Sequence, residues 1–155
     1  MASYVATVDW TLTAEPGDFL AGRYSRAHAI GFDGGLVVPG SPAASSVPAP
    51  WSVEAAADPE ELLVAAVSNC HMLWFLHKAR EAGFVVARYR DRAEGVMRKN
   101  AEGRLAITRV TLRPEVAFAG EPPDAARLEA LHHAAHEDCF IANSIRAEVV
   151  VEGPR

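Results

Sequence analysis

The stretch from Asp58 to Gly83 constrains the fold of this chain more than any other part of the sequence. It opens with Asp-Pro-Glu-Glu, in which Asp58 is a helix N-cap, Pro59 takes the first helical position, and two glutamates follow near the positive end of the helix dipole. Basic residues precede Gly83, the residue type favoured just after a helix. Because no polar stripe interrupts residues 62–76, we expect a long helix that is buried on nearly all sides.

The apolar surface of such a helix is larger than the rest of a small protein can bury. The chain has 155 residues, 50% of them hydrophobic, which is typical of one compact globular domain. Such a chain does not easily surround an apolar helix of this length by itself. We therefore expect a homodimer, in which a second copy covers part of the helix.

The residues before the helix indicate a small antiparallel sheet. Residues 3–12 mix β-branched and aromatic residues with short polar ones, which favours a strand, and residues 15–18 supply turn chemistry. Extended stretches at 24–32 and 36–38 are joined by Asp-Gly-Gly, a sequence that predicts a hairpin. Residues 39–57 are rich in serine and proline, so we expect a loop.

The residues after the helix predict a second antiparallel sheet with one more helix. Residues 85–97 and 104–118 favour two long strands around a turn. A Pro-Pro-Asp sequence opens a helix over 125–139, and residues 144–151 favour a closing strand. Because helices do not alternate singly with strands, this order predicts an α+β fold in a single domain over residues 1–155.

Charge and hydropathy argue against two classes of partner. Fifteen Lys and Arg against 20 Asp and Glu give a net charge of −5, so nucleic acid is not expected to bind. The longest apolar candidate, residues 62–76, is shorter than the roughly 20 residues of a membrane span and contains polar side chains. The first ten residues lack the features of a signal peptide, so we expect a cytoplasmic protein whose cysteines face a reducing pool. The sequence has no glycine-rich nucleotide motif, and no cofactor is expected.

The sequence has only two cysteines, Cys70 inside the apolar helix and Cys139 near the end of the second. Both could be small buried hydrophobic residues. Alternatively they form a redox pair, in which one thiolate is oxidised to a sulfenic acid and the second thiol condenses with it. A reactive thiolate needs a nearby cation, and the N-terminal hairpin offers Arg23, Arg26 and His28.

Glu60 is a further candidate for such a site. It lies ten residues before Cys70, about 15 Å along a straight helix, so the two side chains cannot touch within one unbroken helix. If both belong to one site, the helix is broken or the glutamate comes from the partner chain. Glu60 could equally serve only to complement the helix dipole.

A second cluster lies on the helix at 125–139. His132 or His133, together with His136 and Cys139, could place imidazoles and a thiolate on one helical face, as a metal site requires. The spacing is permissive, but the chain has no CxxC or HExxH sequence. Solvated or hydrogen-bonded histidines are the commoner outcome, and we expect no metal at the catalytic site.

Two segments of the sequence together resemble the OsmC/Ohr family of thiol-dependent hydroperoxide reductases. They are DPEELLVAAVSNCHMLWFLHKAREAGF and HEDCFIANSIRAEVVVE. The shared features are the Asp-Pro-Glu helix start, Cys70 ten residues after Glu60, and Cys139 before a final strand.

This resemblance implies a domain-swapped α/β homodimer with two long central helices, and it assigns roles to residues. Cys70 would be the peroxidatic thiolate, and Cys139 the resolving thiol that closes an intrachain disulfide. An arginine of the N-terminal hairpin, held by Glu60, would stabilise the thiolate and polarise the peroxide. An external dithiol, either lipoyl-linked or thioredoxin-like, would reduce the disulfide. Arg23 and Arg26 lie three residues apart, so an alternating strand would point them to opposite faces. Of the two, we favour Arg26.

Two positions differ from the pattern of the family's peroxidases. Phe140 follows Cys139 where many members have proline, and His71 follows Cys70. The sequence therefore resembles a divergent subgroup, closer to OsmC-like proteins of unassigned substrate.

Two functional hypotheses follow from the sequence. The first is a two-cysteine peroxidase that reduces organic hydroperoxides in oxidative stress defence, through a Cys70 sulfenic acid and a Cys70–Cys139 disulfide. The alternative is a binding protein without redox turnover, which holds an apolar ligand or a metal at the His132–Cys139 helix.

Overall fold

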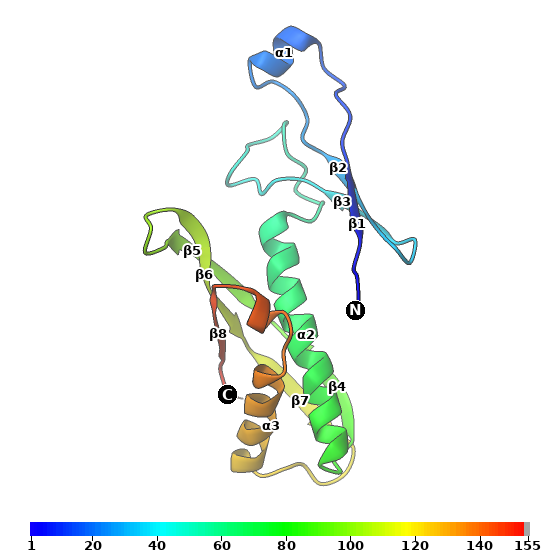
Figure 1. Cartoon of the computed structure of the whole chain (residues 1–155), viewed down its shortest axis with the longest axis vertical. Helices are drawn as coiled ribbons and strands as arrows, with labels where there is room; N and C mark the ends of the chain where they lie inside the picture. Colours follow the sequence, from blue (N-terminus) through cyan, green and yellow to red (C-terminus); the bar gives the residue numbers. More distant parts are fainter. Residues whose placement is uncertain (154–155) are drawn as a thin grey trace. The chain divides into compact units, whose positions relative to one another are not determined.

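The computed structural model of the chain describes residues 1–153 and confirms an α+β fold. Along the sequence, strands precede and follow one long helix, as the colours of Figure 1 trace from the N-terminus to the C-terminus. The chain divides into two compact units, residues 1–62 and the residues from 63 onward. Assignment of the whole chain to a single domain stays a prediction.

The first unit holds the predicted N-terminal antiparallel sheet, in the order β1-β2-β3. The bounds of its strands are β1 Ala6–Asp9, β2 His28–Phe32 and β3 Val37–Gly40. The hairpin between β2 and β3 is confirmed, and Gly35 takes a φ of +86° in its turn, a conformation that favours glycine. The strands are shorter than the sequence indicates, so both Arg23 and Arg26 precede β2.

The turn expected at residues 15–18 is instead the start of a short helix, α1 (Pro16–Leu20). Pro16 fits the first helical position because a backbone N–H there would have no acceptor within the helix, so proline loses no hydrogen bond. Asp18 adds a negative charge in the first turn, where the helix dipole favours it. The same residue types that favour a turn therefore begin a helix here.

The long helix predicted from the sequence is α2 (Pro59–Glu81). Its N-terminus is a capping box, since Asp58 Oδ1 accepts from Glu61 N at 2.7 Å and Glu61 Oε2 accepts from Asp58 N at 3.3 Å. Gly83 follows the C-terminus with a φ of +83°. Among the described residues, no helix combines the length and the apolar character needed to cross a bilayer.

Burial of α2 is more one-sided in the single chain than the sequence predicts. Its fully buried residues form one stripe at intervals of four: Val67, His71, Phe75 and Ala79. Outside the stripe Leu73 is 56% exposed. In the single chain, α3 and the two sheets of the second unit cover only one face, so burial on nearly all sides stays a prediction that depends on a second copy.

The strands after α2 differ from the two long strands that the sequence indicates. There are four, followed by α3, a 3₁₀ turn and a last strand: β4 Val86–Asp91, β5 Glu94–Lys99, β6 Leu105–Leu112, β7 Pro114–Phe118, α3 Ala125–Glu137, η1 Ala142–Ser144 and β8 Glu148–Val151. The β5–β6 hairpin is the predicted one, and β4 pairs with β7 in a separate antiparallel sheet. The closing strand β8 is present but pairs with β6 in parallel.

Asp91 explains why the long strands are split. Its Oδ1 accepts a hydrogen bond from the backbone N of Arg113 at 2.6 Å, and its Oδ2 accepts from Ser68 Oγ on α2 at 2.5 Å. Because the backbone N–H of Arg113 donates to Asp91, it is not available for hydrogen bonds between strands, and Pro114 has no N–H to donate. The chain therefore changes from one sheet to the other at this point, and the same carboxylate ties the sheets to α2.

Two hydrophobic clusters place α2 against its neighbours. Near its C-terminal end, Phe75 and Ala79 pack with Leu131 and Ala135 of α3, and Figure 1 shows α3 beside this part of α2. Nearer its N-terminal end, Val67 packs against β6. Helix α3 begins as predicted, since Asp124 Oδ1 accepts from Arg127 N at 2.8 Å.

Candidate functional site

The structure brings the two cysteines together. Cys70 lies in the middle of α2, and Cys139 lies two residues after the end of α3. The Cys139 thiol lies near enough to Cys70 for Cys70 to raise its pKa, and both cysteines are free. The packing of α3 on α2 thus places in contact two residues that are far apart in the sequence.

The two thiols have different surroundings. Cys139 is 1% exposed, whereas Cys70 is partly exposed. Burial, together with the contact to Cys70, raises the pKa of the Cys139 thiol to about 11, although the backbone N–H of Ala142, 3.4 Å from the sulfur, acts in the opposite direction. Cys139 therefore keeps its proton at neutral pH, and its own burial hides it from solutes.

Cys70 opens into a cavity of about 320 Å³. Its other lining residues are mostly apolar or aromatic: Leu73, Trp74, His77 and Phe140. Trp74 is the centre of this wall, because its ring meets Phe140 edge-on at 5.3 Å and His77 edge-on at 5.5 Å. A solute that reaches Cys70 through this cavity meets apolar surface first.

The two arginines of the first unit are held differently. Arg23 pairs with Asp18 at 2.6 Å, so its charge already has a partner. Arg26 stacks on the Tyr24 ring at 4.0 Å from the centroid and donates to the Tyr24 carbonyl oxygen at 3.1 Å. Neither contact of Arg26 involves a carboxylate. Of the two arginines, Arg26 is therefore the one without an acidic partner among the described residues. Strand alternation does not separate the two arginines, because both precede β2.

Glu60 stands in the first turn of α2, and the capping box uses its neighbour Glu61. The helix is continuous from Pro59 to Glu81, so Glu60 cannot reach Cys70 along the helix of its own chain. Within residues 1–153 it forms no ion pair with a basic side chain. A shared site would therefore need Glu60 from a partner chain.

The histidines of α3 make contacts with different neighbours. In the part of the chain that the structure describes, no group of three His, Cys, Asp or Glu side chains converges on one point. His132 turns inward and meets His71 of α2, with 3.1 Å between Nδ1 and Nε2, while His133 lies 3.5 Å from Glu137 at the surface. The His71–His132 pair is the contact that sequence analysis missed. Its one signal was a histidine in the middle of an apolar helix.

Two thiols in contact, one exposed to an apolar cavity and one buried and protonated, suit stepwise oxidation. The exposed sulfur can react with an oxidant that enters the cavity, and the second sulfur is its neighbour, as disulfide formation requires.

Comparisons with known proteins show the family and the fold of the chain. The family model described as OsmC-like protein matches residues 52–152. An OsmC-like protein of unknown function from Vibrio cholerae is 46% identical, covers 98% of this chain and 99% of its own, and superposes with a TM-score of 0.94. No protein among those with curated descriptions matches.

More distant solved structures share the fold alone. The organic hydroperoxide resistance protein OhrB of Bacillus subtilis is 23% identical, with a TM-score of 0.63 and 96% of each chain covered. An organic hydroperoxide resistance protein from Legionella pneumophila is 18% identical, with a TM-score of 0.70, 98% of this chain and 95% of that one covered. With a family match over residues 52–152 and a full-length relative at 46% identity, this chain belongs to the family of OsmC-like proteins.

Proposed function

We propose that this protein is a two-cysteine peroxidase that reduces organic hydroperoxides and serves in oxidative stress defence. The observation that carries the proposal is the contact between Cys70, which opens into an apolar cavity, and the buried thiol of Cys139. The names of the Bacillus and Legionella structures, which refer to organic hydroperoxide resistance, support the same chemistry.

In the first step the Cys70 thiolate attacks the distal oxygen of the hydroperoxide. A sulfur–oxygen bond forms while the oxygen–oxygen bond breaks, and the alkoxide leaves as an alcohol after taking up a proton. The sulfur is oxidised by two electrons to a sulfenic acid, and the peroxide is reduced by the same two.

In the second step the Cys139 sulfur attacks the Cys70 sulfur. The disulfide forms, the sulfur–oxygen bond breaks, and the leaving hydroxide departs as water with the proton that Cys139 gives up. Because burial raises the pKa of Cys139 to about 11, this thiol stays protonated until the sulfenic acid is beside it. The order of the two oxidations follows from this difference.

The cavity favours an organic substrate. Leu73, Trp74 and Phe140 offer apolar surface to an alkyl or aryl group, which hydrogen peroxide lacks. Binding energy from that group would hold the peroxide at Cys70.

Arg26 and Glu60 complete the proposed site. Arg26 would stabilise the thiolate and polarise the peroxide, and Glu60 would orient the guanidinium by a charge-assisted hydrogen bond. Because Glu60 cannot reach Cys70 within its own helix, we place this pair in a homodimer in which a partner chain contributes to the site. Exposed apolar side chains such as Leu73 on α2 support an association between two copies.

An external dithiol, lipoyl-linked or thioredoxin-like, would return the disulfide to two thiols in the cytoplasm.

Intact mass under non-reducing conditions tests the proposal. Fully reduced protein is measured before and after one equivalent of cumene hydroperoxide, beside Cys70→Ser and Cys139→Ser. We expect the wild type to lose about two mass units by forming one disulfide. Cys139→Ser should instead gain oxygen on Cys70, and Cys70→Ser should not change. An unchanged wild type would contradict the proposal and favour the non-redox alternative.

A further inference from the structure

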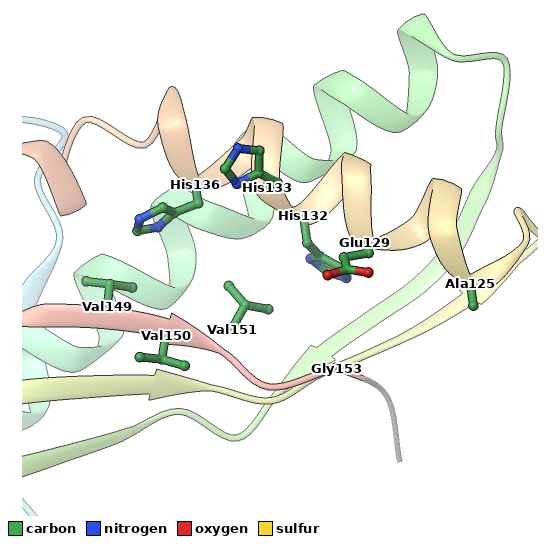
Figure 2. A pocket seen from close by; sticks show the side chains of 9 residues that line it. All are labelled: Ala125, Glu129, His132, His133, His136, Val149, Val150, Val151 and Gly153. Carbon is green, nitrogen blue, oxygen red and sulfur yellow. The ribbon is translucent and has the colours of Figure 1, made fainter.

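A second cavity, of about 610 Å³, lies between α3 and β8 and shares no lining residue with the cavity at Cys70. Figure 2 shows it from close by: imidazoles and Glu129 project from α3 on one side, and valines of β8 lie on the other. Its volume falls in the usual range of small-molecule sites, about 300–1,000 Å³. The peroxidase chemistry proposed above does not use it.

His132 is the most firmly held polar group of this cavity. It is 6% exposed, its Nδ1 lies 3.1 Å from His71 Nε2, and the Phe75 ring stacks on it at 4.3 Å. Burial lowers the pKa of both His71 and His132 to about 4, so both imidazoles are neutral at physiological pH. Each ring therefore carries one N–H.

The position of the two protons follows from His71. Its Nδ1 is buried without a hydrogen-bond partner in the described part of the chain. If Nδ1 carried the proton, a buried N–H would be left unpaired, which is the rarer defect in folded proteins. The proton therefore lies on His71 Nε2 and is donated to His132 Nδ1. His132 then carries its own proton on Nε2.

With its proton on Nε2, His132 has an N–H donor that can serve a ligand in the cavity. Within residues 1–153 no acceptor bonds to His132 Nε2, and the residue lines the cavity. His136 lines it too, and its Nδ1 is a further buried atom without a partner. Two imidazole nitrogens of α3, His132 Nε2 and His136 Nδ1, are thus without a hydrogen-bond partner among the described residues.

We propose that this cavity binds a small uncharged molecule with an apolar body and a hydrogen-bond acceptor, such as a ketone, which accepts from His132 Nε2–H. The apolar body would lie on Val149 and Val151, which Figure 2 shows pointing toward α3. The lining residues that the structure describes include no Lys or Arg and do include Glu129, which disfavours a carboxylate.

Binding of three matched probes tests the ligand class. Acetophenone has the acceptor, ethylbenzene lacks it, and benzoate is charged. Ligand-observed NMR on the full-length protein should show saturable binding of acetophenone, about tenfold weaker binding of ethylbenzene for one lost hydrogen bond, and no binding of benzoate. Equal affinity for acetophenone and ethylbenzene, or tighter binding of benzoate, would overturn the ligand class.

A pair of variants tests the location. Val151→Phe fills the cavity and should abolish acetophenone binding, while Val85→Phe adds the same ring at an exposed position outside the lining and should leave binding unchanged. Binding that survives Val151→Phe would place the probe elsewhere, for instance at the Cys70 cavity, and would overturn the proposal.

Nitrogen-15 NMR of the wild type locates the proton on the His132 ring, and it tests the proposal even if Val151→Phe does not fold. At neutral pH we expect the His132 proton on Nε2, and acetophenone should shift that resonance. A proton on His132 Nδ1, or no response to a saturating probe, would show that the cavity lacks the proposed donor.

Discussion

The buried thiol of Cys139 is in contact with the partly exposed Cys70, although one belongs to the end of α3 and the other to the middle of α2. In the proposed mechanism, this difference in exposure is the reason why Cys70 reacts first and Cys139 second.

Removing either sulfur should have a different effect. Cys70→Ser should reduce peroxide consumption by a thousandfold or more, on the order of the losses seen when a nucleophile is removed. Cys139→Ser should retain the first step and then stop, because the sulfenic acid has no thiol to attack it. Rapid-mixing measurements of peroxide loss, with and without dithiol, distinguish the two. Full turnover by Cys70→Ser would contradict the assigned roles.

Phe140 should contribute to substrate preference. Phe140→Ala removes apolar surface and the edge-on contact with Trp74, so kcat/KM for cumene hydroperoxide should fall about tenfold. The value for hydrogen peroxide should stay the same, since that substrate has no group to fill the cavity. Phe32→Ala, at an exposed position of β2, is the matched control. An equal loss for both substrates would indicate damage to the thiol site itself.

The two arginines provide a paired test of thiolate stabilisation. Arg26→Ala should slow alkylation of Cys70 by iodoacetamide at neutral pH by about tenfold, because the thiolate loses its cation. Arg23→Ala should have little effect, since that guanidinium is already paired with Asp18 at 2.6 Å. Arg26→Lys, which keeps the charge, should restore part of the rate. The reverse ranking of Arg23 and Arg26 would assign the role to Arg23.

The His71–His132 pair predicts acid sensitivity. Folding lowers the pKa of each to about 4, below the value near 6.5 of an unfolded histidine, so unfolding takes up protons between these values. The free energy of unfolding should be highest above pH 7 and fall as the pH drops toward 4, by up to about 2.7 kcal/mol per pH unit while two protons are taken up. Urea unfolding across this range measures the slope. His133→Gln, at the surface, should leave it unchanged; a flat profile in the wild type would mean that the pair is not neutral.

The proposed homodimer predicts that stability depends on protein concentration. If two copies bury the exposed side of α2, the thermal midpoint should rise with concentration, because association stabilises the folded chain. Sedimentation at the same concentrations gives the mass of the species. A monomer mass with a constant midpoint would remove the proposed contribution of a partner chain.

Sequence patterns predicted the elements whose signals are local. The ends of α2 and α3 follow from Asp58, Gly83 and Asp124, because capping involves only residues a few positions away. Asp91 shows the opposite case: its bonds to Ser68 and Arg113 span more than 20 residues, so the split of the strands could not be predicted from alternation.

The candidate site divides in the same way. The family resemblance pointed to Cys70 and Cys139 as a pair, and their roles stay predictions, whereas the His71–His132 pair depends on how α3 is rotated against α2. Nothing in the spacing of the histidines fixes that rotation. The parallel pairing of β8 with β6 is likewise a product of the whole chain path.

The buried stripe of α2 repeats every four residues, so the spacing of the stripe by itself does not set the position of the helix to within one turn, or about 5.4 Å. Two hydrogen bonds remove that freedom: Ser68 to Asp91 at 2.5 Å and His71 to His132 at 3.1 Å. Both lie within two residues of Cys70. The directional hydrogen bonds next to Cys70 thus set its position along the helix axis relative to Cys139, which non-directional apolar contacts do less exactly.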